Sequence, residues 1–123
     1  MKEIIERLDP GVHQFWAVDV QQPRGKTPEK DYFMMVIGRY LDAFLPEKSV
    51  EEAWVCAGTS YLSAGSYKKD CNGLAVSRDV IGEAHLWRDR KLTRPTFFIS
   101  DDLKAEIDAA GLRIFQHHKL IDV

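Results

Sequence analysis

Cysteine is scarce in this chain, because among 123 residues only Cys56 and Cys71 carry a thiol. Structural zinc sites are built from clustered pairs of cysteine or histidine ligands, so two separated cysteines exclude a zinc finger. The N-terminal stretch MKEIIERLDP is charged throughout and lacks the apolar core of a signal peptide. We therefore expect a cytoplasmic protein in which both thiols stay reduced.

Long apolar runs and a strong charge of either sign are also missing. The sequence has no stretch of about 18 apolar residues, which excludes a transmembrane helix. A net charge of −2 is far from the strongly basic surface that general nucleic-acid binding requires. Since 45 % of the residues are hydrophobic and 29 % are charged, the composition is that of a globular protein. We expect residues 1–123 to form one domain with a substantial core.

The motifs of common cofactor and nucleophile sites are absent as well. The sequence has no glycine-rich phosphate loop, no dinucleotide-binding fingerprint and no GxSxG elbow. Of the four histidines, His117 and His118 are adjacent and would face opposite sides of a strand, so they cannot share a metal ion. A pairing of His85 with either cysteine has no flanking catalytic signature. We therefore expect no catalytic residue, no metal and no cofactor.

The clearest local pattern lies near the C-terminus. Residues 96–99 are β-branched and aromatic, which predicts a strand, and Ser100 then supplies a hydroxyl where a helix needs an N-cap. Leu103 and Ile107 begin an apolar stripe with helical spacing, so the helix must pack against a sheet. Residues 112–115 are apolar again and predict a returning strand. The sequence thus indicates a strand–helix–strand unit.

Two earlier apolar segments are predicted strands, joined by a solvated loop. Residues 12–20 have apolar side chains on both faces, which indicates a strand away from the edge of a sheet. Residues 32–37 are also apolar on both faces, and we expect them to form the central strand. Residues 21–30 between them contain two prolines, a glycine and four charged residues, which is typical of a hairpin connection.

The middle of the chain is less regular. Residues 53–57 predict another strand, in which Cys56 is expected to be a buried and inert thiol. Residues 58–73 are rich in glycine, serine and tyrosine and are expected to be the least structured segment, with Cys71 exposed. Because the predicted strands follow one another through short turns, we expect an α+β fold with a mainly antiparallel sheet and a few short helices.

Two groups of residues have the composition of a protein-binding surface. Tyrosines stand among serines and glycines in the irregular segment, and tyrosine offers a large contact area at low entropic cost. Basic residues precede the C-terminal helix and acidic residues begin it, which gives a bipolar surface that can orient a partner. The same patterns also fit folded-back tyrosines and two solvated faces. The predicted partner-binding residues are Tyr61, Tyr67, Arg88, Arg90, Asp101 and Asp102.

Two other classes of function stay open at this point. One is a small enzyme or ligand-binding domain with a pocket around His85 and Trp87. The other is a structural module of a longer protein.

Four segments carry a resemblance to a known family, in the same order as in that family. They are LDPGVHQFWAVDV (residues 8–20), YFMMVIGRYLDAF (32–44), DVIGEAHLWRD (79–89) and TFFISDDLKAEIDAAGLRIF (96–115). Together they span most of the chain. The chain thereby resembles the bacterial immunity proteins of family eleven, which belong to polymorphic toxin systems and were formerly a domain of unknown function.

The resemblance implies a cytoplasmic protein that binds a cognate toxin and neutralises it. We expect the mechanism to be non-catalytic occlusion, in which a preformed surface covers the toxin's active site or a docking face. It offers no catalytic residue to carry over, and the matching Trp87 and residues 97–98 look like determinants of the fold. Members of the family usually have a longer N-terminal segment, so we expect this chain either to lack that leading segment or to be a shortened member. The resemblance names neither the toxin nor the oligomeric state.

Overall fold

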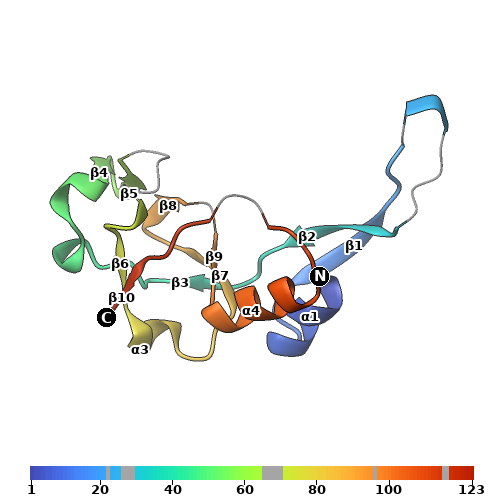
Figure 1. Cartoon of the computed structure of the whole chain (residues 1–123). Helices are drawn as coiled ribbons and strands as arrows, with labels where there is room; N and C mark the ends of the chain where they lie inside the picture. The colour runs from blue at the N-terminus through green and yellow to red at the C-terminus, as the bar shows by residue number, and fades with distance from the viewer. Residues whose placement is uncertain (22, 26–29, 65–70, 96, 115–116) are drawn as a thin grey trace.

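The computed structural model describes residues 1–21, 23–25, 30–64, 71–95, 97–114 and 117–123, and short strands and helices alternate along them (Figure 1). The helices are α1 (Lys2–Leu8), α3 (Arg78–Ile81) and α4 (Asp101–Ala109), with 3₁₀ turns at η1 (Pro23–Gly25), η2 (Pro46–Lys48) and η3 (Glu51–Ala53). The strands are β1 (Gln14–Val18), β2 (Tyr32–Val36), β3 (Tyr40–Leu41), β4 (Trp54–Ala57), β5 (Ser60–Ser63), β6 (Ala75–Val76), β7 (Leu86–Asp89), β8 (Leu92–Arg94), β9 (Phe98–Ile99) and β10 (Ile121–Asp122).

The described strands form four small sheets. Two sheets have three strands each, in the orders β3-β7-β9 and β4-β5-β8, and two have a single pair, β1-β2 and β10-β6. The two longest ladders, β1–β2 and β4–β5, are antiparallel, as is β7–β9. The short pairs β3–β7, β5–β8 and β10–β6 are parallel. The predicted α+β class is therefore confirmed.

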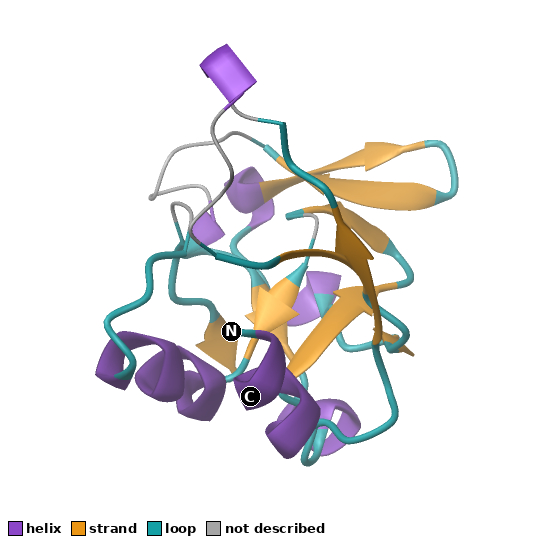
Figure 2. Ribbon diagram, turned by 90° about the vertical axis from the view of Figure 1, so that its right-hand side faces the viewer, coloured by secondary structure: helices purple, strands orange, loops and turns teal. Residues whose placement is uncertain are grey.

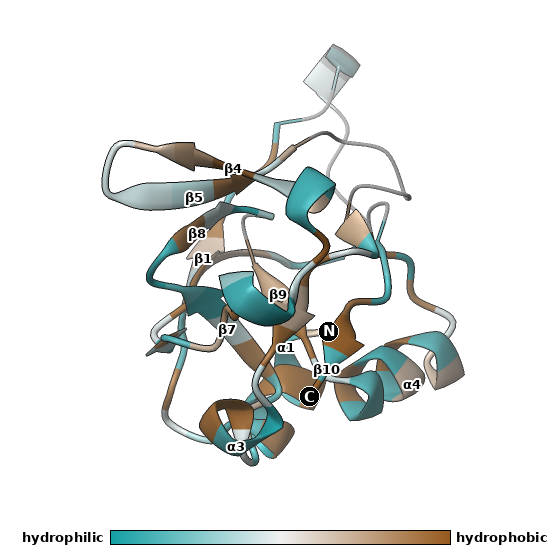
Figure 3. Ribbon diagram, turned by 90° about the vertical axis from the view of Figure 1, so that its left-hand side faces the viewer, coloured by the Kyte–Doolittle hydropathy of each residue, from teal (hydrophilic) through white to brown (hydrophobic). Residues whose placement is uncertain are grey.

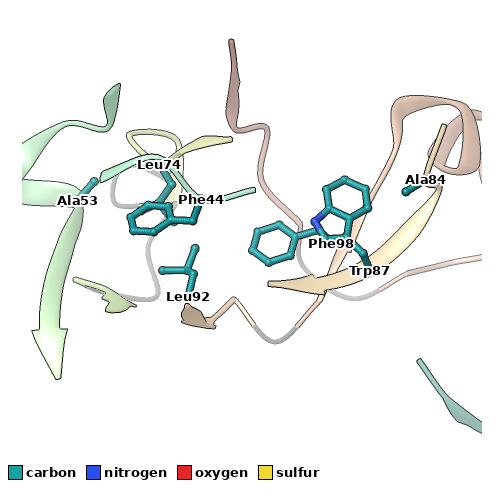
Figure 4. Close-up of a cluster of buried hydrophobic side chains, with 7 residues drawn as sticks. All are labelled: Phe44, Ala53, Leu74, Ala84, Trp87, Leu92 and Phe98. Carbon is teal, nitrogen blue, oxygen red and sulfur yellow. The ribbon is translucent and has the colours of Figure 1, made fainter. Parts of the chain in front are cut away.

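Strand β7 lies at the centre of the molecule. It pairs with β3 on one side and with β9 on the other. Successive residues of a strand point to opposite faces, so Leu86 and Trp87 serve two different hydrophobic clusters. Leu86 packs with Ile5, Ile37, Leu103 and Ile107 in one of them. Trp87 belongs to the other, drawn in Figure 4, whose members are Phe44, Ala53, Leu74, Ala84, Trp87, Leu92 and Phe98.

Helix α4 forms as its sequence predicts. The Ser100 hydroxyl accepts a hydrogen bond from the amide of Leu103 at 3.1 Å, which satisfies one of the free donors of the first turn. Leu103 and Ile107 are 1 % and 2 % exposed. Figure 2 shows α4 beside α1 at the lower edge of the molecule, with the strands above them. The predicted packing of this helix against a sheet is confirmed, and α1 covers its flank.

The strand expected at residues 112–115 is wrong for the part of it that the structure describes. Residues 112–114 have no strand structure, Phe115 lies outside the described residues, and the closing strand is β10. It pairs with β6, whose Ala75 and Val76 are buried. The strand–helix–strand unit is therefore β9–α4–β10, and its last strand is placed by a partner from a distant part of the sequence.

The expectation that residues 32–37 form the central strand is wrong. Strand β2 pairs only with β1 among the described strands, and together they form a ribbon that projects from the body (Figure 1). The interior position expected for residues 12–20 is wrong for the same reason. Only Ile37, just after β2, enters the core, with 5 % exposure.

The structure also reverses the expected positions of the two cysteines. Residues 58–73 contain an unexpected strand, β5, which forms a hairpin with β4 (Figure 3). Cys56 lies on this hairpin and is exposed, whereas Cys71 is buried with 5 % exposure. An apolar run predicted a buried strand, but an outer strand of a protruding hairpin leaves its side chains in solvent.

Candidate functional site

A buried carboxylate, Asp9, stands at the end of α1 with 3 % of its surface exposed. Its Oδ1 accepts a hydrogen bond from Arg39 Nη1 at 2.6 Å, and its Oδ2 accepts one from the amide of Leu86 at 2.8 Å. The His85 amide, at 3.2 Å, and His13 Nε2, at 3.3 Å, also donate to Oδ2. One side chain therefore joins α1, the residue before β1, the residue before β3 and the start of β7.

These donors set the charge state of Asp9. Burial by itself raises the pKa of the Asp9 carboxyl, because a charged group loses its hydration. The hydrogen bonds from two side chains and two backbone amides lower the pKa by more, so its net value lies below the ordinary 3.8. Asp9 is therefore a buried carboxylate anion at neutral pH.

His13 extends this network to the base of the β1–β2 ribbon. Its Nδ1 accepts a hydrogen bond from the amide of Gly38 at 3.1 Å, so we assign the proton of a neutral imidazole to Nε2. A Cβ at Gly38 would lie 2.0 Å from the carbonyl oxygen of Val12, which is much closer than two such atoms can approach. The position therefore requires glycine, which has no Cβ. The residues before β1 and after β2 are thus held tightly together.

A second buried carboxylate, Asp89, closes the other end of β7. Its Oδ2 accepts hydrogen bonds from the amides of Ala43, at 2.9 Å, and Phe44, at 2.8 Å. Its Oδ1 accepts hydrogen bonds from the amides of Lys91, at 2.9 Å, and Leu92, at 3.0 Å. Both oxygens accept hydrogen bonds within the fold, as they do in Asp9.

A cavity of about 660 Å³ lies between β7, β9, the start of α4 and the C-terminal segment. Trp87 and Phe98 form part of its wall, and their rings stack with centroids 5.7 Å apart. An ion pair between Asp101 and Lys119 lies among the lining side chains. The volume falls within the range of about 300–1,000 Å³ that is typical of ligand sites.

Of the two residues around which a pocket was expected, one borders this cavity. Trp87 lines this cavity, but His85 is not among the described residues that line it. The Nδ1 of His85 instead forms a hydrogen bond with the Ser100 hydroxyl at 2.8 Å. Because the same hydroxyl caps α4, this histidine supports the start of the helix.

The predicted partner-binding residues lie on several elements. Tyr61 is half-buried in β5, with its ring 5.4 Å from that of Phe44 and 5.2 Å from that of Trp54. Arg88 is half-buried in β7, and Arg90 is exposed just after that strand. The prediction for Tyr67 lies outside the described residues.

The two acidic members of that set are on the first turn of α4. Asp101 and Asp102 are both exposed, and Asp101 forms its ion pair with Lys119. The described members of the set are therefore divided among β5, β7 with the residues after it, and α4.

The largest concentration of exposed apolar side chains in one described element is on the β1–β2 ribbon. The register places Trp16 opposite Met34 and Val18 opposite Tyr32, and residues directly opposite each other share a face. Trp16 is 50 % exposed, Met34 60 % and Tyr32 45 %. We call the exposed side of the ribbon the ribbon face, and its members are Gln14, Trp16, Val18, Tyr32, Met34 and Val36.

The opposite side of the ribbon turns toward the body at its base only, because Ala17 and Phe33, farther along that side, are exposed, Phe33 at 42 %. Phe15 and Met35 are half-buried there and pack against the hydrophobic cluster that includes α1 and α4. The Lys2 ammonium lies 5.5 Å from the Phe15 ring centroid and 5.4 Å from that of Phe33. Since one side is anchored in this way, the ribbon face is turned outward.

Sequence reasoning missed Asp9, Asp89 and the ribbon face. Asp9 is followed by Pro10 and Gly11, and the three residues together have the composition of an ordinary turn. Asp89 lies among basic residues, which predict a segment exposed to solvent. For the ribbon, the long polar loop after β1 was the available signal, because a strand pair with such a loop often protrudes. No local signal distinguished the buried aspartates from exposed ones.

Neither a metal-binding cluster nor a membrane-spanning helix is present among the described residues. Within the part of the chain that the structure describes, no group of three or more histidine, cysteine, aspartate or glutamate residues is arranged to hold a metal ion. None of the described helices has the length and apolar character needed to cross a membrane.

Comparison with known proteins identifies the family. The model of the family described as "Immunity protein family (Imm11)" matches residues 1–121 of the 123. No curated protein and no solved structure matches the chain. The family match includes both buried aspartates, the ribbon and α4, and it agrees with the resemblance carried by the four sequence segments. The chain therefore belongs to the Imm11 immunity protein family.

Proposed function

We propose that this protein binds a cognate bacterial toxin and neutralises it by covering the toxin's active site or a docking face, without catalysis. The observation that carries this proposal is the match of residues 1–121 to an immunity protein family. The setting would be a polymorphic toxin system, in which the protein acts in the cytoplasm of the cell that has to be protected.

The use of the polar side chains is consistent with binding rather than turnover. The carboxylate oxygens of Asp9 and Asp89 accept hydrogen bonds from backbone and side-chain donors within the fold. The His85 imidazole is bonded to the hydroxyl that caps α4. These groups hold distant segments of the fold together, and a preformed surface loses little entropy on binding.

Co-expression tests the protective role. The toxin domain encoded by the gene next to this one would be expressed in a sensitive bacterial host, with and without this protein. We expect growth to be rescued by this protein and not by an unrelated immunity protein. Lack of rescue, when both proteins are soluble and present in excess over the toxin, would contradict the proposed function.

Recovery of the toxin separates occlusion from catalysis. The purified complex would be dissociated in denaturant, and the toxin would be refolded alone. We expect its mass to be unchanged and its activity to return, because occlusion leaves no covalent mark. A toxin that is cleaved or modified by substoichiometric amounts of this protein would show that neutralisation is enzymatic.

Charge reversal addresses the binding residues predicted from the sequence. Arg90 and Asp102 are exposed, so Arg90→Glu and Asp102→Lys change the surface without disturbing the core. If the bipolar surface contributes, these variants should slow association, and added salt should reduce the difference from wild type. His85→Ala should retain rescue.

A further inference from the structure

The ribbon face combines exposure with an absence of charge. Its six side chains are one amide, one phenol and four apolar groups, and none is ionised at neutral pH. Four of them are between 44 % and 60 % exposed, namely Trp16, Tyr32, Met34 and Val36. Exposed aromatic and methionine side chains at this density are typical of surfaces that are covered when a protein functions.

The ribbon is also held firmly at its base. The Nδ1 of His13 accepts a hydrogen bond from the Gly38 amide, and its Nε2 bonds to the buried Asp9 carboxylate. Gly38 also lies so close to the Val12 carbonyl that no side chain fits between the two strand ends. Phe15 adds an anchor in the hydrophobic cluster. A protruding element that is fixed in this way presents its side chains in one arrangement before a partner arrives.

The exposed area indicates what kind of partner covers this face. Four half-exposed side chains leave about 400 Å² of apolar surface, given that an aromatic side chain buries about 150–250 Å². Two copies packed face to face would bury about 800 Å² in total, which is the size of a crystal contact and well below the roughly 1,200–2,000 Å² of a stable complex. A larger partner that also covers the sides of the ribbon can reach that size.

We propose that the ribbon face is the surface through which this protein docks on its toxin, and that it contacts an apolar patch of the toxin. The inference rests on the proposed function and names its binding surface. Trp16 and Met34, opposite each other at the middle of the ribbon, are the central contact. Tryptophan is enriched among the residues that dominate binding energy, and uncharged contacts of this kind are insensitive to salt.

The test measures the affinity of the purified chain for the purified toxin domain encoded by the adjacent gene, by calorimetry. The double variant Trp16→Ser with Met34→Ser should raise Kd by about 30-fold or more, since residues of this type carry large shares of binding energy. The matched control is Val55→Ser with Val80→Ser, two residues that are 47 % and 45 % exposed on β4 and α3. The control should leave Kd within about threefold. Raising the salt concentration should leave the wild-type affinity nearly unchanged.

The possible results separate this inference from the proposed function. If wild type binds and rescues growth while the folded ribbon variant binds equally well, the docking surface is wrong and the function stands. If wild type neither binds nor rescues, the function fails and the inference fails with it. If wild type alone is a dimer that the ribbon variant dissociates, a second copy covers the face and the proposal is overturned. If the double variant has a lower melting temperature than wild type, Met34→Lys replaces it in the binding measurement. This substitution puts a charge on the ribbon face, which opposes apolar contact, and it leaves no cavity because the new side chain is not smaller.

Discussion

Strands β2 and β7 show that apolar content and burial are separate properties of a short strand. Strand β2 reads YFMMV and has no polar residue other than the tyrosine hydroxyl, yet Met34 at its middle is 60 % exposed. Strand β7 reads LWRD and is half charged, yet Leu86, Trp87 and Asp89 are all buried. The strand with the weaker hydrophobic signal is the centre of the fold.

The difference comes from what surrounds each strand. Strand β7 has a neighbour on both sides and a carboxylate at each end. Asp9 accepts a hydrogen bond from the amide of Leu86, and Asp89 accepts hydrogen bonds from the amides of residues 43–44, after β3, and 91–92, after β7. Strand β2 has β1 as its described neighbour, and Trp16, Tyr32, Met34 and Val36 on one face of the pair are between 44 % and 60 % exposed. A charged residue can therefore be a core residue when enough donors converge on it.

Among the substitutions that test this comparison, Asp89→Ala should cause the largest loss of stability. The substitution leaves four amides near the end of β7 without their acceptor, and each buried donor that loses its partner costs about 1–3 kcal/mol. We expect the free energy of unfolding, measured in urea, to fall by about 4 kcal/mol or more. Asp102→Ala, at an exposed position, is the control. An unchanged urea midpoint for Asp89→Ala would show that β7 does not depend on this carboxylate.

Truncation of a side chain in each strand compares their burial directly. Leu86→Ala, in β7, should cost about 2–5 kcal/mol of unfolding free energy, because it removes a fully buried side chain and leaves a cavity. Met34→Ala, in β2, should change the stability by less than about 0.5 kcal/mol, because its side chain already lies in solvent. Thermal and urea unfolding of both variants measure the difference. Equal losses would mean that the ribbon is packed in solution.

Gly38→Ala tests the attachment of the ribbon to the body. A methyl group there would approach the Val12 carbonyl to 2.0 Å, so the two strand ends must move apart. We expect a loss of about 1–3 kcal/mol in unfolding free energy, with faster hydrogen exchange of the β1 and β2 amides. Gly111→Ala does not serve as a control, because its positive φ adds strain of its own. If the β1 and β2 amides of Gly38→Ala exchange hydrogen at the wild-type rate, the close contact between Gly38 and Val12 does not hold the ribbon to the body.

The smallest effect is the dependence of stability on pH through Asp9. Its pKa is lower in the folded state than the ordinary 3.8, so ionised Asp9 stabilises the fold above that pH, and the contribution is lost as the pH falls through the folded pKa. We expect stability to decline below pH 3.8. In Asp9→Asn this part of the decline should be absent, although the variant is weaker at neutral pH. Parallel acid profiles for both proteins would contradict the role of Asp9.

Local patterns were enough to predict α4 and the class of the fold. Ser100, Leu103 and Ile107 follow one another at steps of three and four residues, so neighbouring members lie about one helical turn apart and their spacing carries the information that the helix needs. The family resemblance of four segments in order was confirmed by a match to residues 1–121. The predicted partner-binding residues and the docking surface stay predictions, because binding depends on a surface that a linear sequence does not display.

What the sequence by itself determined is therefore the capped helix, the alternation of short strands and turns, and the family. Only the tertiary structure decided that β7 is central, that β2 is exposed, that Cys71 is buried and that Asp9 and Asp89 are core residues. Asp9 accepts a hydrogen bond from the amide of Leu86, which is 77 positions away in the sequence. Asp89 accepts one from the amide of Ala43, which is 46 positions away. Partners at such separations leave no periodic mark in the chain, and an apolar residue has the same letter whether another element covers it or not.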